Sequence, residues 1–315
     1  MSKALAVALV LCSAVAGRDR GGSNYGWYHL DPGCLRGPYG VVANYDKARP
    51  EIDRQLKAMY QNGQRRLRIP IYFGRGLGGG TVLDSTGGDL AASYRENLTN
   101  LLRTIRKTGF KEIIVGFFPL GPNEPSRWTA FQEDYYEENW ALIRNLRPLI
   151  TGAKIRYRID LGNEGSPSAS QRVALEYCQR LWNQYAVMYG TLDTVGFSII
   201  PSPDRLRLVS AVYGDSPFGN HGEPPALDLH FYRAAQQNFK LAAGILRGAG
   251  YRQPWILGEC FFNDAEEAEA LRQAIRATGQ HVLFLLQWPM RANSACHELD
   301  VAPPLDFDQY RSRGF

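Results

Sequence analysis

Ile159-Asp160-Leu161-Gly162-Asn163-Glu164 is an apolar, strand-like run that ends on a carboxylate. Further along the chain, Ile256-Leu257-Gly258-Glu259-Cys260-Phe261 has the same character. Short apolar runs bounded by Gly and Asn are typical of buried strands. The fold must therefore deliver two acidic side chains from the ends of two different strands.

Strand-like and helix-like stretches alternate through the chain, with short connections rich in Gly, Pro, Asn and Asp. This alternation is typical of βαβ units and a parallel sheet. The predicted strands are 25–30, 65–73, 112–120, 154–161, 194–201, 227–232, 255–261 and 282–289. Strands of this number close a (β/α)8 TIM barrel. We find no linker or repeat that marks a second domain, so we expect one α/β barrel domain over residues 17–315.

Apolar residues at a 3.6-residue period predict the helices between these strands. Leu90, Leu98 and Ile105 belong to one such stripe, and the stretch 174–185 carries another. Asp264, followed three residues later by Glu267, predicts a capping box that opens the helix after the seventh strand.

Residue parity indicates which side chains point into the barrel, because alternate residues of a barrel strand face inward. Over 154–161 the even-numbered residues are polar and the odd-numbered ones apolar, so the polar set, continued by Glu164, is expected inside. The same alternation groups Arg66 with Arg68, Asp228 with His230 and Tyr232, and Trp255 with Leu257 and Glu259, and leaves Cys260 facing the helices.

Composition is that of an ordinary globular protein that can bury a large core: 315 residues, 44% hydrophobic and 21% charged. The net charge of +5 comes without a Lys/Arg block, so we infer no nucleic-acid partner. Aromatic residues make up 12%, which suits carbohydrate binding because sugar rings stack on aromatic faces. We expect a monomer.

Residues 1–16 have the pattern of a signal peptide, with Lys3, a short apolar run and Ala14-Val15-Ala16 as a cleavage site. The run is shorter than the ~20 apolar residues of a spanning helix. Leu11 is bulkier than the small residue usual before a lipoprotein cysteine, here Cys12. We therefore expect a secreted or periplasmic protein without a membrane span.

Four cysteines follow residue 16, and in an exported protein they permit disulfides. Cys34 and Cys296 follow the first and eighth strands, which are neighbours in a closed barrel, so these two would pair if a disulfide forms. We expect Cys178 and Cys260 to be buried. None has CxxC or Cys/His spacing, so we predict no metal site and no cofactor.

Candidate site residues lie at or near the carboxyl ends of the predicted strands, where catalytic groups of this fold sit. Two carboxylates from different strands can cleave a glycosidic bond: one exchanges a proton with the glycosidic oxygen and the other attacks or stabilises the sugar carbon. The candidates are Arg68, Glu164, His230, Tyr232, Glu259 and Trp288.

In these positions the chain resembles the glycoside hydrolases of clan A, and the family 5 cellulase-like enzymes most of all. The matching motifs are Leu67-Arg68-Ile69-Pro70, Gly162-Asn163-Glu164, His230-Phe231-Tyr232, Gly258-Glu259 and Gln287-Trp288. One position departs from the family, which carries a His near the end of the third strand where this chain has Phe117-Phe118-Pro119.

The resemblance implies a retaining reaction, which places the two carboxyl groups about 5–5.5 Å apart. Glu164 would be the acid/base, its pKa raised by the neighbouring carboxylate and by burial. Glu259 would be the nucleophile, kept ionised by Tyr232 and Arg68.

Substrate binding is implied for several other side chains. Asn163 would bind the sugar 2-hydroxyl, His230 would orient the acid/base or bind substrate, and Trp288 would stack on the sugar on the non-reducing side. Further aromatic candidates for the cleft are Trp27, Trp128 and Tyr213.

Structural roles remain as alternatives at this point. Both glutamates could form salt bridges with barrel arginines (Arg66, Arg68, Arg156 or Arg158), and Arg68 could neutralise Asp160 or Asp228. His230 could be a core histidine and Trp288 ordinary packing.

The sequence thus predicts an exported retaining glycoside hydrolase that acts on a β-linked polysaccharide, within the chain rather than at its end. The alternative is a catalytically silent barrel that binds glycan or assists exopolysaccharide production. A phosphate- or metal-dependent barrel enzyme is disfavoured, because no phosphate-binding Gly loop follows the late strands and no His/Asp cluster is present.

Overall fold

The structure is a computed structural model that describes residues 21–31, 33, 39–296 and 299–315. The predicted signal peptide, 1–16, and Cys34 lie outside these residues. Cys296 is disulfide-bonded, whereas Cys178 and Cys260 are buried free thiols. The proposed Cys34–Cys296 pairing therefore stays a prediction.

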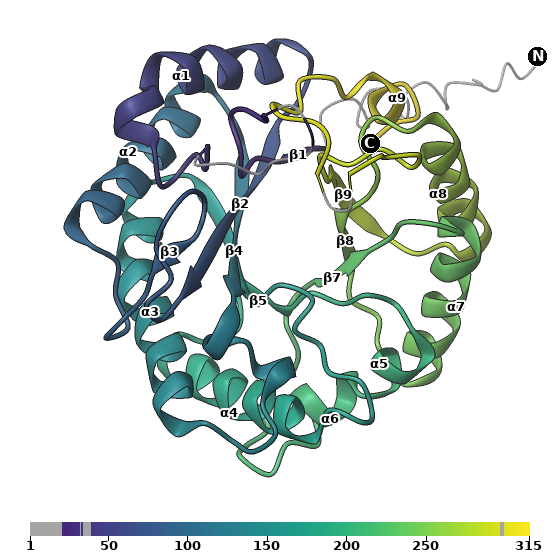
Figure 1. Ribbon diagram of the computed structural model, residues 1–315. Helices are drawn as coiled ribbons and strands as arrows, with labels where there is room; N and C mark the ends of the chain where they lie inside the picture. The colour runs from purple at the N-terminus through teal and green to yellow at the C-terminus, as the bar shows by residue number, and fades with distance from the viewer. Residues whose placement is uncertain (1–20, 32, 34–38, 297–298) are drawn as a thin grey trace, which may run out of the picture.

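Eight parallel strands form the predicted barrel, with helices around it (Figure 1). They are β1 (Gly22–Asn24), β2 (Arg66–Gly74), β4 (Glu112–Pro119), β5 (Arg156–Gly162), β6 (Thr194–Phe197), β7 (Leu227–His230), β8 (Trp255–Glu259) and β9 (Val282–Gln287). A short strand, β3 (Leu83–Asp84), pairs with β2 outside the ring. Ile199 closes the barrel: its N–H donates to Asp228 O (3.0 Å), and its carbonyl accepts from His230 N–H (2.9 Å).

Amphipathic helices cover the barrel, and their apolar stripes supply the layer between helices and strands. The long ones are α1 (Tyr45–Gln61), α2 (Ala92–Thr108), α3 (Glu133–Gly152), α4 (Arg172–Tyr189), α7 (Ala235–Gly248) and α8 (Ala265–Thr278). The short ones are α5 (Pro203–Arg207), α6 (Val209–Tyr213), α9 (Asp308–Arg311) and the 3-10 turns η1 (Gly121–Asn123) and η2 (Pro125–Arg127). Within the described residues, no helix combines the length and apolar character needed to cross a membrane.

The first strand lies earlier than predicted, at Gly22–Asn24 instead of 25–30. The reason is steric: a Cβ on Gly22 would come within 1.8 Å of the Arg66 carbonyl oxygen, so only glycine fits beside β2. The aromatic stretch that follows lies beyond the strand end, where Trp27 forms an isolated bridge with Gly40.

The N-cap of α8 is confirmed, because the Asp264 side chain accepts from Glu267 N–H at 2.7 Å. The reciprocal half of the capping box is not formed. Instead the Glu267 carboxylate accepts from Phe261 N–H (2.6 Å) and lies 2.9 Å from the Tyr310 hydroxyl, behind the end of β8.

The barrel interior has an apolar middle layer between a charged cluster at its amino end and polar groups at its carboxyl end. Ile114, Val195, Ala226, Ile256, Phe284 and Leu286 form the apolar plug. At the amino end, Glu112 binds three arginines: Arg158 at 2.8 Å, Arg66 at 3.2 Å and Arg156 at 3.3 Å. These arginines are therefore not the partners of Glu164 and Glu259.

In β8 the alternation of residues did not predict correctly which side chains face into the barrel. Trp255 and Leu257 face the helices, and the Trp255 ring lies 4.9 Å from that of Phe239 in α7. Glu259 nevertheless points inward, because the pairing with β7 shifts register between Leu229–Leu257 and His230–Glu259. Such a bulge re-aims the next side chain.

Candidate active site

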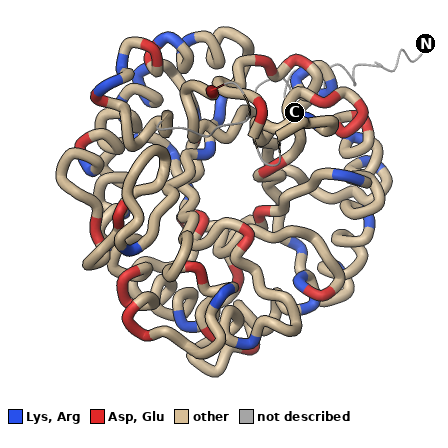
Figure 2. Tube along the Cα trace, in the orientation of Figure 1, with Lys and Arg blue, Asp and Glu red and all other residues tan. Residues whose placement is uncertain are grey.

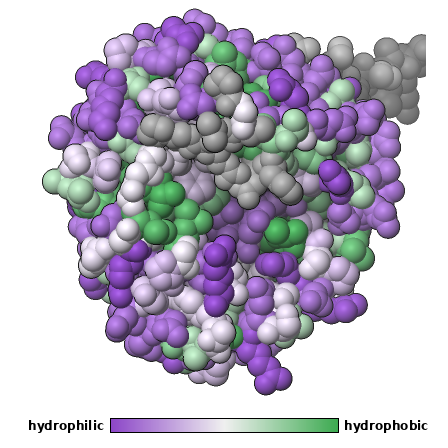
Figure 3. Space-filling model, in the orientation of Figure 1, coloured by the Kyte–Doolittle hydropathy of each residue, from purple (hydrophilic) through white to green (hydrophobic). Residues whose placement is uncertain are grey.

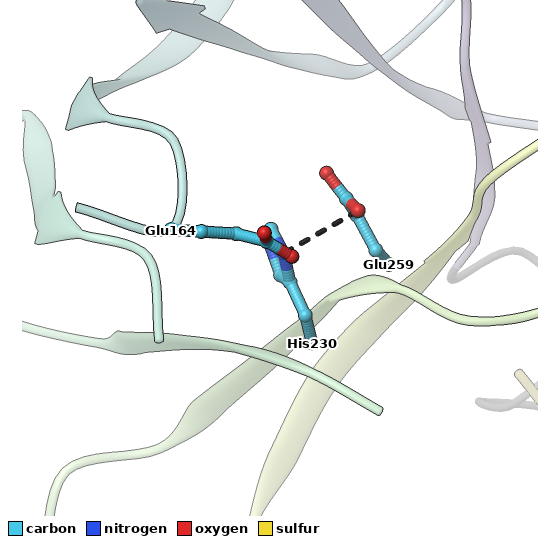
Figure 4. A group of neighbouring side chains, drawn as sticks. All are labelled: Glu164, His230 and Glu259. Carbon is cyan, nitrogen blue, oxygen red and sulfur yellow. Dashed lines mark hydrogen bonds and ion pairs between the residues drawn. The ribbon is translucent and has the colours of Figure 1, made fainter. Parts of the chain in front are cut away.

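Glu164, His230 and Glu259 meet at the carboxyl end of the barrel (Figure 4). His230 ends β7 and Glu259 ends β8, while Glu164 lies in the turn after β5. The His230 Nδ1 atom is 3.1 Å from Glu164 Oε1 and 3.4 Å from Glu259 Oε2. One ligand atom from each of the three residues lies within 4.8 Å of the others, so a carboxylate oxygen of Glu164 faces one of Glu259 across a narrow gap.

Glu164 is held in a tight turn with a left-handed backbone, φ +50°. Its N–H donates to Ser198 Oγ at 2.7 Å, and Arg205 donates to the carbonyl oxygens of Glu164 (3.2 Å) and Ser166. A non-glycine residue at positive φ needs such support. These contacts fix the turn while its side chain, 31% exposed, reaches the cleft.

Glu259 is buried and both of its oxygens accept hydrogen bonds. Arg68 Nη1 donates to Oε1 at 2.6 Å, and the Tyr232 hydroxyl donates to Oε2 at 2.7 Å. Hydrogen bonds from charged and hydroxyl donors favour the ionised carboxylate.

Arg68 is fully buried in β2 and connects the site to the barrel interior. Besides Glu259 it donates to Asp160, to Asn163 Oδ1 (2.8 Å) and to Asn24 Oδ1 (3.3 Å). It therefore neutralises Asp160 and also lies beside Glu259, so the two roles weighed from the sequence are combined in one side chain.

A cation could be held by the three ligand atoms of Glu164, His230 and Glu259, judged by distance alone. The chemistry of the donor set does not favour one, because both Glu259 oxygens already bind Arg68 and Tyr232. We assign no metal to this group.

The pKa of Glu164 is shifted in the opposite direction to the one predicted from the sequence. Burial raises its pKa, but the hydrogen bond and charge of His230, together with Arg68 and Arg205, bring the pKa below its usual value. Burial outweighs the neighbouring cations at Glu259, whose pKa is raised. Burial lowers the pKa of His230, yet Glu259, Glu164 and Asp228 raise it overall. The prediction of a raised Glu164 pKa is thus wrong, because it left out the effect of the His230 hydrogen bond and charge on this carboxyl group.

A mostly aromatic cluster lies beside Arg68 and Tyr232, the two residues that bind Glu259. The cluster contains Trp27, Phe118, Trp288 and Leu299. Trp288 is 8% exposed and Trp27 only 3%, packed edge-on against Trp288 with the ring centroids 5.8 Å apart. Trp288 thus keeps a small accessible surface, whereas Trp27 is almost completely buried.

Phe118 stands where the family pattern has a histidine. Its ring stacks near Trp288 (6.3 Å, 20°), and the Arg68 guanidinium lies 5.0 Å above its centroid. An apolar wall therefore replaces a hydrogen-bonding group at the end of β4.

A cleft of about 420 Å³ opens on the Glu164 side of the pair. Its lining includes Phe118, Leu120, Glu124, Gln171, Ile200 and Arg205. In Figure 3 the central hollow of this face is hydrophilic, with a hydrophobic patch on either side.

Two predicted cleft aromatics lie elsewhere. Tyr213, 2% exposed, packs beneath β6, where its hydroxyl accepts from Phe197 N–H at 2.9 Å. Trp128 does not line the cleft, because its Nε1 donates to Pro122 O (2.8 Å) and its ring packs against Tyr177. Both are corrections: each ring serves packing, which the sequence pattern did not distinguish from exposure.

Sequence reasoning missed Asn24, Ser198 and Arg205. Asn24 fell outside the predicted first strand. Ser198 and Arg205 bind backbone atoms of a neighbouring loop, and the sequence carries no pattern that predicts such contacts. Ser202, the N-cap of α5, is a signal that could have predicted the helix that carries Arg205.

The fold and site together define a (β/α)8 barrel with a paired-carboxylate centre at the carboxyl ends of its strands. No protein-family model matches the sequence, and no curated protein sequence matches it significantly. Solved structures do share the fold.

A glycoside hydrolase family 5 enzyme from Prevotella bryantii B14 is 14% identical, with a TM-score of 0.59 over 95% of this chain and 97% of that one. An exo-β-1,4-mannosidase from Opitutaceae bacterium strain TAV5 is 17% identical, with a TM-score of 0.58 over 88% of this chain. This chain spans only 55% of the mannosidase chain. The homocysteine methyltransferase MmuM of Escherichia coli is 13% identical, with a TM-score of 0.52 over 93% and 94%.

These likenesses establish the barrel, and the first confirms the resemblance in fold to family 5 glycoside hydrolases. The methyltransferase shows that the same barrel supports other chemistry. The reaction must therefore be argued from the site.

Proposed function

We propose that this protein is a retaining glycoside hydrolase that cleaves a β-linked polysaccharide within the chain, with Glu164 as acid/base and Glu259 as nucleophile. The observation that carries the proposal is the facing pair of carboxylate oxygens, within 4.8 Å of each other across His230. Retaining enzymes need closely spaced carboxyl groups, whereas inverting ones leave room for a water molecule.

In the first step Glu259 attacks the anomeric carbon while Glu164 protonates the departing oxygen. Arg68 and Tyr232 hold the attacking carboxylate in place, and their hydrogen bonds favour its ionised form against the burial that raises its pKa. Glu164 is the more exposed carboxylate and borders the open cleft, which suits a group that must reach the leaving oxygen.

In the second step Glu164, now ionised, takes a proton from water, and the water attacks the glycosyl–Glu259 ester. Asn163, whose Oδ1 accepts from Arg68 Nη2 at 2.8 Å, would bind the 2-hydroxyl of the sugar. The lowered pKa of Glu164, caused by His230, Arg68 and Arg205, favours this base role.

Internal cleavage is supported by binding surface on both sides of the carboxylate pair. The cleft borders Glu164 and includes Phe118, which also belongs to the Trp288 cluster, and Tyr232, packed against that cluster, donates to Glu259. A chain that crosses both surfaces is cut internally.

Glu259→Gln tests the proposal. Wild-type protein should release oligosaccharides from at least one member of a panel of β-glucans, mannans, xylans and bacterial exopolysaccharides, and the variant should not. Glu266→Gln, the same change at an exposed residue of α8, is the matched control. NMR of the first product should show retained anomeric configuration; inversion would contradict the nucleophile assignment.

A silent glycan-binding barrel is the alternative outcome. It would bind a glycan of the panel equally well with and without the Glu259→Gln change and would hydrolyse none. Export is part of the proposal and rests on residues 1–16; Edman sequencing of secreted protein should find a start near residue 17.

A further inference from the structure

The polar end of the barrel contains more acids than bases. Glu164, Glu259, Asp160 and Asp228 face two guanidinium groups, Arg68 and Arg205, and one imidazole, His230. If all four carboxyl groups were ionised and His230 were protonated, the group would carry a net charge of −1. Burial disfavours such an excess, so the group retains protons. Figure 2 shows acidic residues around the central opening of the barrel.

Asp228 is the member of this group that the proposed reaction does not use. It lies in β7, fully buried, and neither carboxylate oxygen has a hydrogen-bond partner among the described residues. Gly258 makes room for it, because a Cβ at that position would lie 2.1 Å from Asp228 Oδ1. The His230 Nε2 atom is 3.9 Å from the same oxygen and also has no hydrogen-bond partner among the described residues.

The two nitrogens of His230 therefore face different carboxylates. Nδ1 faces Glu164 and Glu259 at 3.1 and 3.4 Å, and Nε2 faces Asp228. A proton on Nε2 is attracted to Asp228. Nδ1 can then interact favourably with Glu164 only if one further proton lies between the two atoms.

We propose that Asp228 is a positioning residue that keeps a proton on His230 Nε2, so that Nδ1 and Glu164 share the single proton that Glu164 delivers to the leaving group. This inference rests on the proposed function. It states where the proton that Glu164 donates is held before the reaction. The shared proton has two limiting positions: an imidazolium beside ionised Glu164, or a neutral imidazole beside protonated Glu164.

Bonds and protons balance over the two steps of the proposed reaction. When the C1–O bond breaks, its electron pair goes to the leaving oxygen, which takes the shared proton from Glu164, and Glu259 forms the new bond to C1. His230 is then neutral with its proton on Nε2. In the second half the water oxygen bonds to C1 while the C1–Glu259 ester bond breaks and its electron pair returns to the Glu259 carboxylate. Glu164 takes the proton of that water, which restores the proton shared with His230.

All groups that face His230 enter the pH dependence. Glu164 comes from the turn after β5, Glu259 from β8, Arg68 from β2 and Asp228 from its own strand. Asp160 of β5 acts on Asp228. Burial, the largest effect, raises the pKa of Asp228 to about 6, so its ionisation and the retention of the shared proton coexist only over a limited pH range.

Asp228→Asn tests the inference. The amide can turn its NH2 toward Nε2, which would move the histidine proton to Nδ1, where two carboxylates accept it. In serine proteases the corresponding Asp→Asn change inverts the histidine tautomer and lowers kcat by about 10⁴. Long-range 1H–15N NMR of the five histidines, assigned with His230→Gln, should show Nε2–H in the wild type and an Nδ1–H tautomer in the variant.

Kinetics give a second readout that a general loss of structure would not produce. With a poor leaving group, kcat/KM should fall by the contribution of general acid catalysis, about 10²- to 10⁴-fold. An activated dinitrophenyl glycoside, which needs no protonation, should lose far less. The basic limb of the pH–rate profile should also move to lower pH.

Glu267→Gln is the control, since it changes a buried carboxyl to an amide outside the barrel interior. It should leave both the His230 tautomer and the leaving-group dependence unchanged. An Nδ1–H tautomer in wild-type protein, or equal losses on both substrates in Asp228→Asn, would overturn the inference while leaving the proposed hydrolysis intact. A wild type that hydrolyses nothing would instead refute the proposed function, and the NMR comparison would still decide the tautomer.

Discussion

Glu267 behind β8 makes the stability of the protein depend on pH. Its side chain is 6% exposed, and burial, the largest effect, raises its pKa from 4.5 to about 8. The native state therefore holds a proton that the unfolded chain releases. This contribution to stability is complete below the unfolded pKa and is lost as the pH rises toward the folded value.

The size of this loss of stability follows from the pKa shift of Glu267. Between about pH 5 and about pH 8 the wild type should lose on the order of 3 kcal/mol of unfolding free energy from this group alone. Glu267→Gln removes the titration but keeps an oxygen for Phe261 N–H. The stability of the variant relative to wild type should therefore increase steadily over that range.

Urea unfolding at several pH values measures this difference, with exposed Glu266→Gln as the control. Any destabilisation by the new NH2 group would be the same at every pH. It would therefore not change how the stability difference between variant and wild type depends on pH. A wild-type-minus-variant difference that stays constant from acidic to alkaline pH would refute the buried, protonated carboxyl.

Other substitutions test further parts of the site. Tyr213→Phe removes the oxygen that accepts a buried backbone N–H, and should cost about 1–3 kcal/mol of stability in urea unfolding with unchanged KM. Gly258→Ala would bring Cβ to 2.1 Å from Asp228 Oδ1, and should cost about 1–3 kcal/mol or more while lowering kcat. Arg205→Gln should lower kcat by about 10² with little change in melting temperature, since it frees the turn after β5; unchanged kcat would exclude that positioning role.

The sequence was sufficient for the barrel and for the residues that meet at its mouth, because strand ends converge once the fold is known. Polar residues at alternate positions of β5 correctly placed Asp160 inside. In β8 the same rule succeeded for Glu259 and failed for Trp255, because a bulge is a property of strand pairing, which a single strand does not reveal.

Other features depend on contacts between loops. The turn of Glu164 is held by Arg205 from a helix about forty residues away in sequence, at a position that no periodicity marks. The sign of the Glu164 pKa shift likewise required the position of His230 Nδ1, because burial and a charged neighbour act in opposite directions. Buried and exposed aromatics, such as Tyr213 and Trp288, have the same sequence signature.

In the proposed hydrolase, Phe118 would give the site a means of discriminating between sugars. A hydroxyl group directed at this phenyl wall would give up its hydrogen bonds to water and gain none, at a cost of about 1–3 kcal/mol. A ring that presents hydrogen or a methyl group there bears no such cost. Epimers and deoxy sugars without a hydroxyl group at the carbon that faces Phe118 would therefore be preferred. This selectivity would come from excluding a hydroxyl group and not from an added contact.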